Sequence, residues 1–234
     1  MKNKSVKPQK SPAKKSAGKK LNIAVVGATG LVGKAFLKLI ERRGLEYDKL
    51  YLFASERSKD TKIKFMGKTF VVDDVKNYKK NRYDVAFFSA GTQVSLDYAP
   101  GFAKHGALVV DNSAAFRMDE NVPLVVPEVN FEDALEHNGI IANPNCSTIQ
   151  MLLALWPLHK ACEIKRVVVT TFQSVSGTGT PAIEELRRQS QLVLEKGIEE
   201  SYRHGLAKDA YPHQIAFNCL PHIDKFEEDG YTKE

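Results

Sequence analysis

Cys146 is the side chain in this sequence best placed to act as a nucleophile. It follows Asn143, Pro144 and Asn145, after an apolar run that predicts a strand and before an apolar stretch that predicts a helix. A thiol at a helix N-terminus meets N–H groups without helical partners and the positive end of the helix dipole, and both stabilise a thiolate. A single cysteine is more often a small buried apolar group, so its position alone leaves both roles open.

A glycine-rich segment near the start of the chain is the candidate site for a dinucleotide. Residues 27–33 follow an apolar run, 21–26, and open a stretch with helical spacing of apolar residues, 34–43. In such a loop the first glycine permits a tight turn, the second lets the backbone approach a pyrophosphate, and the third allows the helix to pack on the strand. A strand–helix turn without a ligand is the alternative. The loop residues predicted to contact the cofactor are Gly27, Thr29, Gly30, Leu31, Val32 and Gly33.

The end of the next predicted strand, 49–54, bears on which dinucleotide binds. Glu56, Arg57 and Ser58 follow it. An acid here often binds the ribose hydroxyls of NAD, whereas an arginine and a hydroxyl suit the 2′-phosphate of NADP. Arg57 and Ser58 favour NADP, and Glu56 keeps NAD as the alternative.

A nucleophilic thiol beside a nicotinamide points to the chemistry of aldehydes. The thiolate adds to the carbonyl, hydride leaves to the nicotinamide, and a thioester remains on the sulfur. Attack by inorganic phosphate then releases an acyl phosphate. The reverse direction reduces an acyl phosphate to an aldehyde.

The elements that must position these residues alternate between strands and helices. Further apolar runs predict strands at 70–72, 83–89, 107–110, 124–126 and 139–142, with a helix at 98–104. Continuous apolar strands alternating with helices indicate a parallel sheet that is covered on both faces. We therefore expect an α/β fold, with a Rossmann-type parallel sheet domain that binds NADP over residues 21–145.

From residue 146 the pattern changes, and a second, α+β domain is expected over residues 146–234. A helix is predicted from Cys146 to about Lys160, with Pro157 as a kink or an early end. The later predictions are a strand at 165–172, a long amphipathic helix at 182–196, an irregular stretch at 197–211 and a strand at 215–220.

The charge of the chain is unevenly distributed. The 234 residues carry 34 basic and 28 acidic side chains, but eight of the lysines lie in residues 1–20, which contain no acid and hardly any large apolar residue. We expect this segment to be a disordered basic tail. The remaining 26 basic and 28 acidic residues give no reason to expect a specific nucleic-acid partner.

The sequence predicts neither a membrane span nor a metal site. The longest uncharged run, 138–158, is broken by prolines, and residues 1–20 lack the apolar region of a secretory signal, so a cytoplasmic location is expected. The cysteines are odd in number and form no CxxC pair, which argues against a disulfide framework and a zinc site. They are Cys146, Cys162 and Cys219.

Together these segments resemble the bacterial-type aspartate-semialdehyde dehydrogenase family. The resemblance spans residues 22–234 and is carried by VVGATGLVG, FASERS, FFSAGT, VVDNSAAFR, VPLVVPEVN, NPNCSTIQM, FQSVSGTGTPAIEEL and IAFNCLPHID. It implies NADPH-dependent reductive dephosphorylation of aspartyl 4-phosphate to aspartate semialdehyde, a step towards lysine, threonine, methionine and diaminopimelate. It also implies a homodimer or a higher homo-oligomer.

The resemblance assigns roles to individual residues. Cys146 would carry the acyl group, and Gln173 would orient the substrate. Arg117 would bind the substrate phosphate or inorganic phosphate, because a planar guanidinium suits phosphate oxygens. Asn145 would help to position the thiol or the substrate. The further cofactor contacts implied, beside the glycine loop, Arg57 and Ser58, are Ser89, Ala90, Gly91, Ser176 and Gly177.

The sequence departs from the family in what it lacks. The family's acid–base histidine, and an arginine that grips the substrate carboxylate, belong to a later segment, and none of the six histidines here lies in that motif. We therefore expect an incomplete α+β catalytic and dimerisation domain. The isolated chain should show little or no dehydrogenase activity, since acid–base catalysis contributes roughly 10²–10⁴-fold. The alternatives are the related acetylglutamyl-phosphate reductase and a non-catalytic NADP-binding module.

Overall fold

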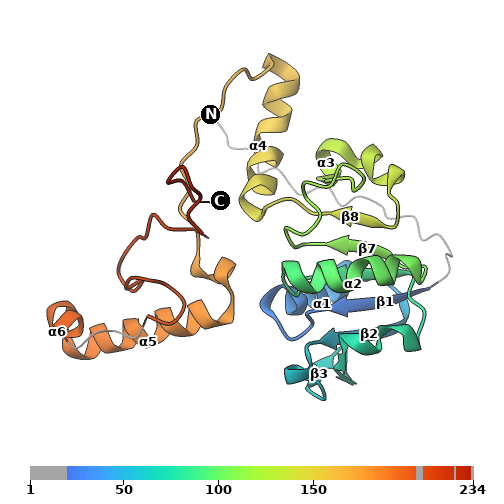
Figure 1. Ribbon diagram of the computed structural model, residues 1–234, viewed down its shortest axis with the longest axis horizontal. Coiled ribbons are helices and arrows are strands. Elements are labelled where there is room, and N and C mark those ends of the chain that lie inside the picture. The colour runs from blue at the N-terminus through green and yellow to red at the C-terminus, as the bar shows by residue number, and fades with distance from the viewer. Residues whose placement is uncertain (1–19, 204–207, 224, 233–234) are drawn as a thin grey trace, which may run out of the picture.

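The computed structural model describes residues 20–203, 208–223 and 225–232 (Figure 1). Apart from Lys20, the predicted basic tail lies outside the described residues. The first half of the described chain forms a sheet with helices, and the second half is drawn out beside it (Figure 1).

A six-stranded parallel sheet forms the centre of the first half. Its strands lie in the order β5-β2-β1-β6-β7-β8, and all neighbouring strands run parallel. Strand β1 pairs with β2 on one side and β6 on the other, so the strand order reverses at β1. Ligands of open α/β sheets bind at the carboxyl ends of the strands beside such a reversal. The strands are β1 (Leu21–Val26), β2 (Tyr47–Ala54), β5 (Asp73–Asp74), β6 (Val85–Phe88), β7 (Leu108–Asp111) and β8 (Ile140–Ala142).

Both faces of the sheet are covered, which confirms the interpretation of its continuous apolar strands. Along β1, Val26 joins one buried cluster and Val25 joins another. Phe102 of α2 (Thr92–Lys104) belongs to the first cluster. Helix α1 (Leu31–Arg43) contributes its buried apolar residues to the second. Alternate residues of one strand are therefore buried on opposite faces, as a parallel sheet of this class requires.

Two of the short predicted strands take a different form. The run 70–72 overlaps an antiparallel hairpin of β3 (Lys62–Phe65) and β4 (Lys68–Val71), which alternating lysines conceal in the sequence. The run 124–126 contributes a single bridge to Ala142. The connections also contain η1 (Glu56–Ser58), η2 (Val75–Lys80), α3 (Pro127–Asn130) and η3 (Phe131–Glu136).

The second half of the described chain is mainly helical. Helix α4 (Cys146–Cys162) continues past Pro157, so the predicted early end at this proline is wrong. A six-residue helix occupies part of the stretch predicted to be irregular. The elements after α4 are η4 (Val175–Thr178), α5 (Thr180–Lys196) and α6 (Ile198–Arg203).

The valine-rich run 165–172 forms no strand, contrary to its prediction. It runs as a connection between α4 and η4, without a ladder partner among the described residues (Figure 1). Val168 is 80% exposed and Phe172 is 88% exposed. Branched and aromatic residues favour strands because they pack on neighbours across a sheet. Here no described strand provides such a neighbour.

The predicted strand at 215–220 is also replaced by turns, because a side chain of α5 takes its donors. Gln189 Oε1 accepts the N–H groups of Ile215 (2.9 Å) and Ala216 (3.1 Å). Glu185, one turn earlier on α5, accepts the backbone N–H groups of Asp209 and Ala210. Gln189 and Glu185 are fully buried. Buried polar groups must find partners, and these two find theirs in the segment that follows α6.

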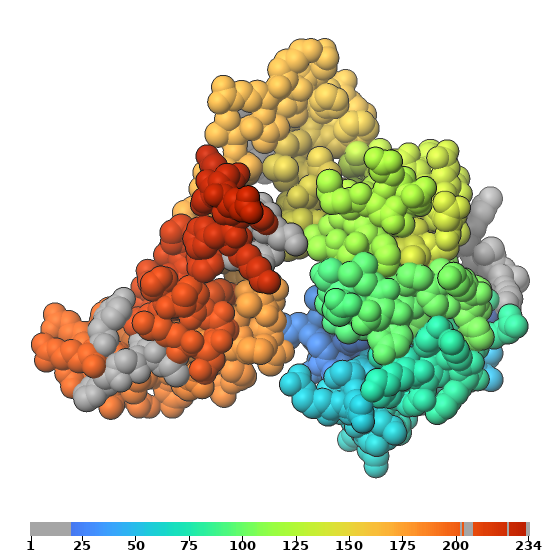
Figure 2. Space-filling model, in the orientation of Figure 1, coloured from blue at the N-terminus to red at the C-terminus, as the bar shows by residue number. Residues whose placement is uncertain are grey.

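Helix α4 and the run after it expose an apolar surface. The helix has no buried residue, and Leu158 is 56% exposed. Figure 2 shows the yellow and gold part of the chain that contains α4 projecting from the rest. No helix in the described part of the chain combines the length and the apolar character needed to cross a bilayer. Contiguous exposed apolar surface usually marks a place of association.

We expect the chain to self-associate through this surface, because exposed extended apolar segments pair with other chains. Val168→Lys and Leu158→Lys should shift the chain towards the monomer in sedimentation experiments. Leu96→Lys, on α2, is the matched control because Leu96 is 45% exposed outside this surface. Sedimentation that is unchanged in both test variants contradicts the prediction.

Candidate active site

The turn after β1 leaves no space for a side chain at two of its glycines. Gly27 has a φ of +87°, and a Cβ on it would lie 2.2 Å from the carbonyl oxygen of Ser89. A Cβ on Gly33 would lie 2.2 Å from the carbonyl oxygen of Gly27. At Gly30 the nearest such contact is 3.3 Å. Gly27 and Gly33 therefore allow strand, turn and helix to pack closely, and Gly30 lies where a ligand can approach the backbone.

The N-terminus of α1 offers N–H donors that no side chain caps. Its N-cap residue, Gly30, makes no side-chain hydrogen bond, and the first turn contains no acidic residue. Leu31 and Val32 are partly exposed, and Thr29 is half-buried. Unpaired N–H groups and the helix dipole favour an anion at this point. The residues present therefore fit the diphosphate of a dinucleotide.

The loop after β6 borders this turn. The N–H of Ser89 donates to the carbonyl oxygen of Val26 at 2.9 Å, and the carbonyl of Ser89 is the group that limits space at Gly27. After Ala90, Gly91 has a φ of +93° and begins α2. The structure thus brings residues 89–91 together with the glycine loop at the carboxyl ends of two adjacent strands.

The corner after β2 carries the charges that bear on the choice of dinucleotide. Glu56, Arg57 and Ser58 form the short turn η1, and Glu56 Oε2 accepts a hydrogen bond from Lys76 Nζ at 2.9 Å. This bond and the charge of Lys76 lower the pKa of Glu56, and the same pairing raises the pKa of Lys76. Both groups are therefore charged at neutral pH and offset each other, while the side chain of Arg57 is exposed beside them.

Nothing in the sequence pattern singles out Lys76. It lies 20 residues after Glu56 and reaches the corner because β5 pairs with the end of β2, with Asp74 opposite Ala54. Asp74 then accepts the N–H of Lys76 at 2.9 Å, which fixes the start of η2. An acid followed two residues later by a lysine is too common a pattern to be recognised without the strand register.

Cys146 is the first residue of α4, and its side chain is exposed. Asn145 caps this helix, because its Oδ1 accepts the N–H groups of Ser147 (2.8 Å) and Thr148 (3.3 Å). The predicted supply of unpaired N–H groups to the thiol is therefore partly wrong, since Asn145 takes two of them. Cys146 still lies at the positive end of the α4 dipole.

Arg117, in the loop after β7, reaches the segment that precedes Cys146. It is half-buried; its Nε donates to the carbonyl oxygen of Asn143 at 2.9 Å, and its Nη2 donates to that of Asn112 at 3.2 Å. The other N–H groups of its guanidinium fork remain for an anion. The structure thus ties Arg117 to the segment that leads into Cys146.

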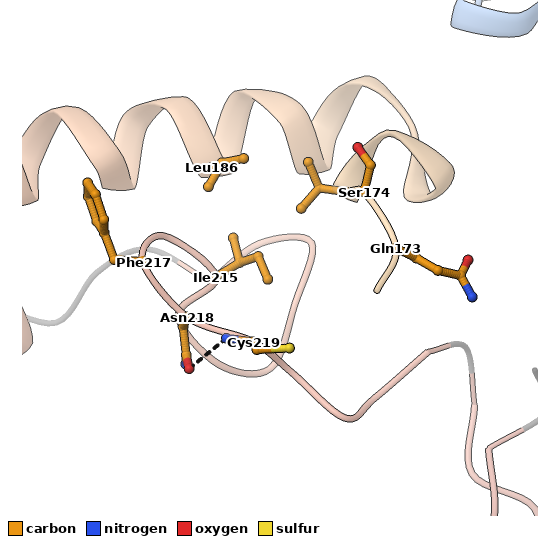
Figure 3. A pocket seen from close by; sticks show the side chains of 8 residues that line it. Gln173, Ser174, Leu186, Ile215, Phe217, Asn218 and Cys219 are labelled. Atoms are coloured by element: carbon orange, nitrogen blue, oxygen red, sulfur yellow. Dashed lines mark hydrogen bonds between the residues drawn. The ribbon is translucent and has the colours of Figure 1, made fainter. Parts of the chain in front are cut away.

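Gln173 lies in the second half of the chain, at a groove of about 700 Å³. Its Nε2 donates to Thr171 Oγ1 at 3.2 Å. Figure 3 shows its side chain projecting away from the apolar side chains of the groove. The residues that line the groove with it are Ser174, Val175, Leu186, Ile215, Phe217, Asn218 and Cys219.

Ser176 and Gly177 form the turn η4 immediately before α5. The N–H of Ser176 donates to Ser174 Oγ at 3.3 Å, and the N–H of Gly177 donates to the carbonyl oxygen of Ser174 at 3.2 Å. Both residues are exposed, and α5 packs against η4. These contacts place Ser176 and Gly177 in the second half of the chain, where Gln173 also lies.

Several of the described histidines contact the backbone or an aromatic side chain. His105 Nε2 bonds the carbonyl oxygen of Asn81, and the ring of His159 stacks on Trp156. Among the residues that the structure describes, no group of three or more histidine, cysteine, aspartate or glutamate side chains is arranged to hold a metal ion.

Two family models match the chain. The NAD binding domain of semialdehyde dehydrogenase matches residues 22–137, and the dimerisation domain matches residues 155–234. The aspartate-semialdehyde dehydrogenase of Bacillus subtilis is 51% identical over 217 residues, which are 93% of this chain and 63% of the relative. That of Aquifex aeolicus is 52% identical over 218 residues, 91% of this chain and 62% of the relative. The chain thus spans slightly less than two thirds of the length of these relatives.

Solved structures lead to the same family. Aspartate semialdehyde dehydrogenase II from Vibrio cholerae matches with a TM-score of 0.85 and 44% identity, over 92% of this chain and 63% of that one. The enzyme from Candida albicans with NADP matches with a TM-score of 0.53 and 28% identity, over 62% and 48% of the two chains. With its cofactor-domain and dimerisation-domain matches and its curated relatives, the chain belongs to the aspartate-semialdehyde dehydrogenase family.

Proposed function

We propose that this chain provides the cofactor site and the nucleophile for the NADPH-dependent conversion of aspartyl 4-phosphate into aspartate semialdehyde and inorganic phosphate. One observation carries the proposal: the exposed Cys146 thiol begins α4, and Arg117 is hydrogen-bonded to the loop before it. The relatives' name supplies the substrate class. Since the chain spans 63% of the Bacillus relative, that relative's activity enters here as a proposal.

Cys146 acts as the acyl carrier in the proposed reaction. Its thiolate attacks the carbonyl carbon of aspartyl phosphate; the C–S bond forms, the C–O bond to phosphate breaks, and phosphate leaves. A nicotinamide cofactor held at the glycine loop would supply the hydride that reduces the thioester. The C–S bond then breaks, the thiolate is regenerated and the aldehyde departs. One hydride and one proton are consumed for each aldehyde formed.

The other proposed site residues orient the substrate. The remaining N–H groups of Arg117 donate to the phosphate, because a guanidinium fork matches two phosphate oxygens. Asn145 fixes the first turn of α4 and with it the direction of the thiol. Gln173 orients the amino-acid end of the substrate with an amide that both donates and accepts.

NADP is proposed over NAD as the cofactor. The N-terminus of α1 suits the diphosphate, and the exposed Arg57 beside Ser58 suits the 2′-phosphate. Glu56 would repel that phosphate, but its charge is offset by Lys76. The loop 89–91 borders the cofactor, and Ser176 and Gly177 are proposed on the nicotinamide side.

The division of labour is also proposed. Residues 21–145 form the cofactor domain, and residues 146–234 belong to the catalytic and dimerisation domain. The match of the dimerisation-domain model supports a homodimer or a higher homo-oligomer.

Arg57→Gln should weaken NADP binding by about tenfold, because a hydrogen bond to a charged group contributes about 1.5–3 kcal/mol. NAD binding should hardly change, since NAD lacks the 2′-phosphate. Titration calorimetry with each dinucleotide measures both affinities. Arg42→Gln, at the end of α1, is the control for the loss of one positive charge. Equal losses for NADP and NAD would rule out Arg57 as the phosphate ligand.

Lys76→Gln should weaken NADP binding by about threefold, because exposed charges that face each other interact only weakly in water. The variant leaves the Glu56 carboxylate without its partner and facing the 2′-phosphate. The double variant Lys76→Gln/Glu56→Gln should regain most of the lost affinity. Failure of this second substitution to restore NADP binding contradicts the role given to the pair.

Although the isolated chain is expected to turn over little, Cys146 should slowly take up one acyl group when the chain is mixed with aspartate semialdehyde and NADP without phosphate. Mass spectrometry of the digested protein should find the adduct on Cys146, and absorbance should record the NADPH formed with it. Cys162→Ser should keep both signals, whereas Cys146→Ser should lose both. A chain that binds NADP but acylates another residue, or none, would refute the proposed nucleophile.

A further inference from the structure

Two side-chain hydrogen bonds join the loop after β7 to the loop after β8, and a third holds Arg117 within the β7 loop. Arg117 Nε donates to the carbonyl oxygen of Asn143 at 2.9 Å, and Arg117 Nη2 donates to that of Asn112 at 3.2 Å. The other bond between the loops runs between two side chains, from Asn143 Nδ2 to Asn112 Oδ1, at 2.6 Å. One guanidinium therefore bridges the backbones of both loops, and an amide pair supports the bridge.

On the β7 side, the bridge is supported by a buried carboxylate, that of Asp111. The carboxylate of Asp111 is inaccessible to solvent and accepts Ser95 Oγ at 2.7 Å, Ser113 Oγ at 2.7 Å and the N–H of Ser113 at 3.1 Å. The backbone carbonyl of Asp111 accepts the N–H of Asn143 at 2.8 Å. A buried carboxylate with three donors holds its loop rigidly, because any movement would leave charge unsatisfied.

The β8 side of the bridge leads directly to the thiol. Only Pro144 and Asn145 separate Asn143 from Cys146. Pro144 is buried and has a restricted φ, and Asn145 is fixed by its two hydrogen bonds to the first turn of α4. A constraint on the backbone at Asn143 is therefore passed on to Cys146 through two residues with little freedom.

We propose that Arg117 is a positioning residue for the Cys146 thiol, in addition to its proposed contact with phosphate. Its guanidinium clamps the two loops and so keeps the sulfur at the N-terminus of α4. This inference rests on the proposed role of Cys146 as the nucleophile. One side chain thus contacts the phosphate and also holds the backbone next to the reacting sulfur.

The geometry requires the fork of an arginine. The Nε and Nη2 atoms point to two different carbonyls, and a planar group with fixed donors holds both at once. A lysine keeps the charge but concentrates it on one nitrogen, which cannot reproduce the two fixed directions. Arg117→Lys therefore separates the clamp from the electrostatic effect of a nearby cation, and Arg117→Gln removes both.

The test is the rate at which iodoacetamide alkylates each cysteine of the intact chain. Cys162 and Cys219 are also exposed, so they report general reactivity within the same sample. Both Arg117→Lys and Arg117→Gln should slow Cys146 by at least about threefold, near the lower end of the net contribution of one typical hydrogen bond. The other two cysteines and the affinity for NADP should not change. Arg42→Lys is the control for the substitution itself.

An Arg117→Lys variant in which Cys146 keeps its rate, or reacts faster, overturns the inference, because the charge alone would then suffice. If Arg117→Lys loses NADP binding, the fold is damaged and Asn112→Ala decides instead. That variant removes the amide pair and keeps the arginine; slower alkylation of Cys146 supports the clamp, and an unchanged rate overturns it. A wild-type Cys146 that reacts no faster than Cys162 and Cys219 overturns the proposed nucleophile, and this inference with it.

Discussion

Parallel hydrogen bonding between neighbouring strands is the constraint on which the whole candidate site depends. Because β1, β6, β7 and β8 run in the same direction, their carboxyl ends meet at one edge of the sheet. The glycine turn, the Ser89 loop, the Arg117 loop and the Cys146 loop each follow one of these ends. The glycine turn and the thiol, far apart in the sequence, thus lie at the same edge of the sheet, with β6 and β7 between their strands.

Local signals in the sequence predict the parts of the site that local structure determines. The glycine loop follows an apolar strand and opens a helix, and Cys146 begins a helix, so both were placed correctly in their elements. The contacts of Glu56 with Lys76 and of Arg117 with Asn143 could not be predicted, because they span 20 and 26 residues and depend on strand register. The run 165–172 was predicted to be a strand and is not one. β propensity describes how well a side chain fits beside its neighbours, and it does not show whether such neighbours exist.

The first and second halves of the chain are each stabilised by a different kind of interaction. The first half has two apolar clusters, one on each face of its sheet. The second half depends more on single polar contacts, such as those of Glu185 and Gln189 with the backbone that follows α6. Substitution of one apolar residue in the first half leaves many other contacts in place. Substitution of Gln189 takes the acceptor from one buried and one partly buried N–H group, which is costly in a segment with few alternatives.

All three cysteines are exposed, so each of them can be oxidised when the protein is stored in air. A thiolate is oxidised to a sulfenic acid, which condenses with a thiol of another molecule to form an intermolecular disulfide. Storage without a reductant therefore links molecules through their cysteines and blocks the proposed nucleophile, Cys146, while the secondary structure of the preparation stays intact.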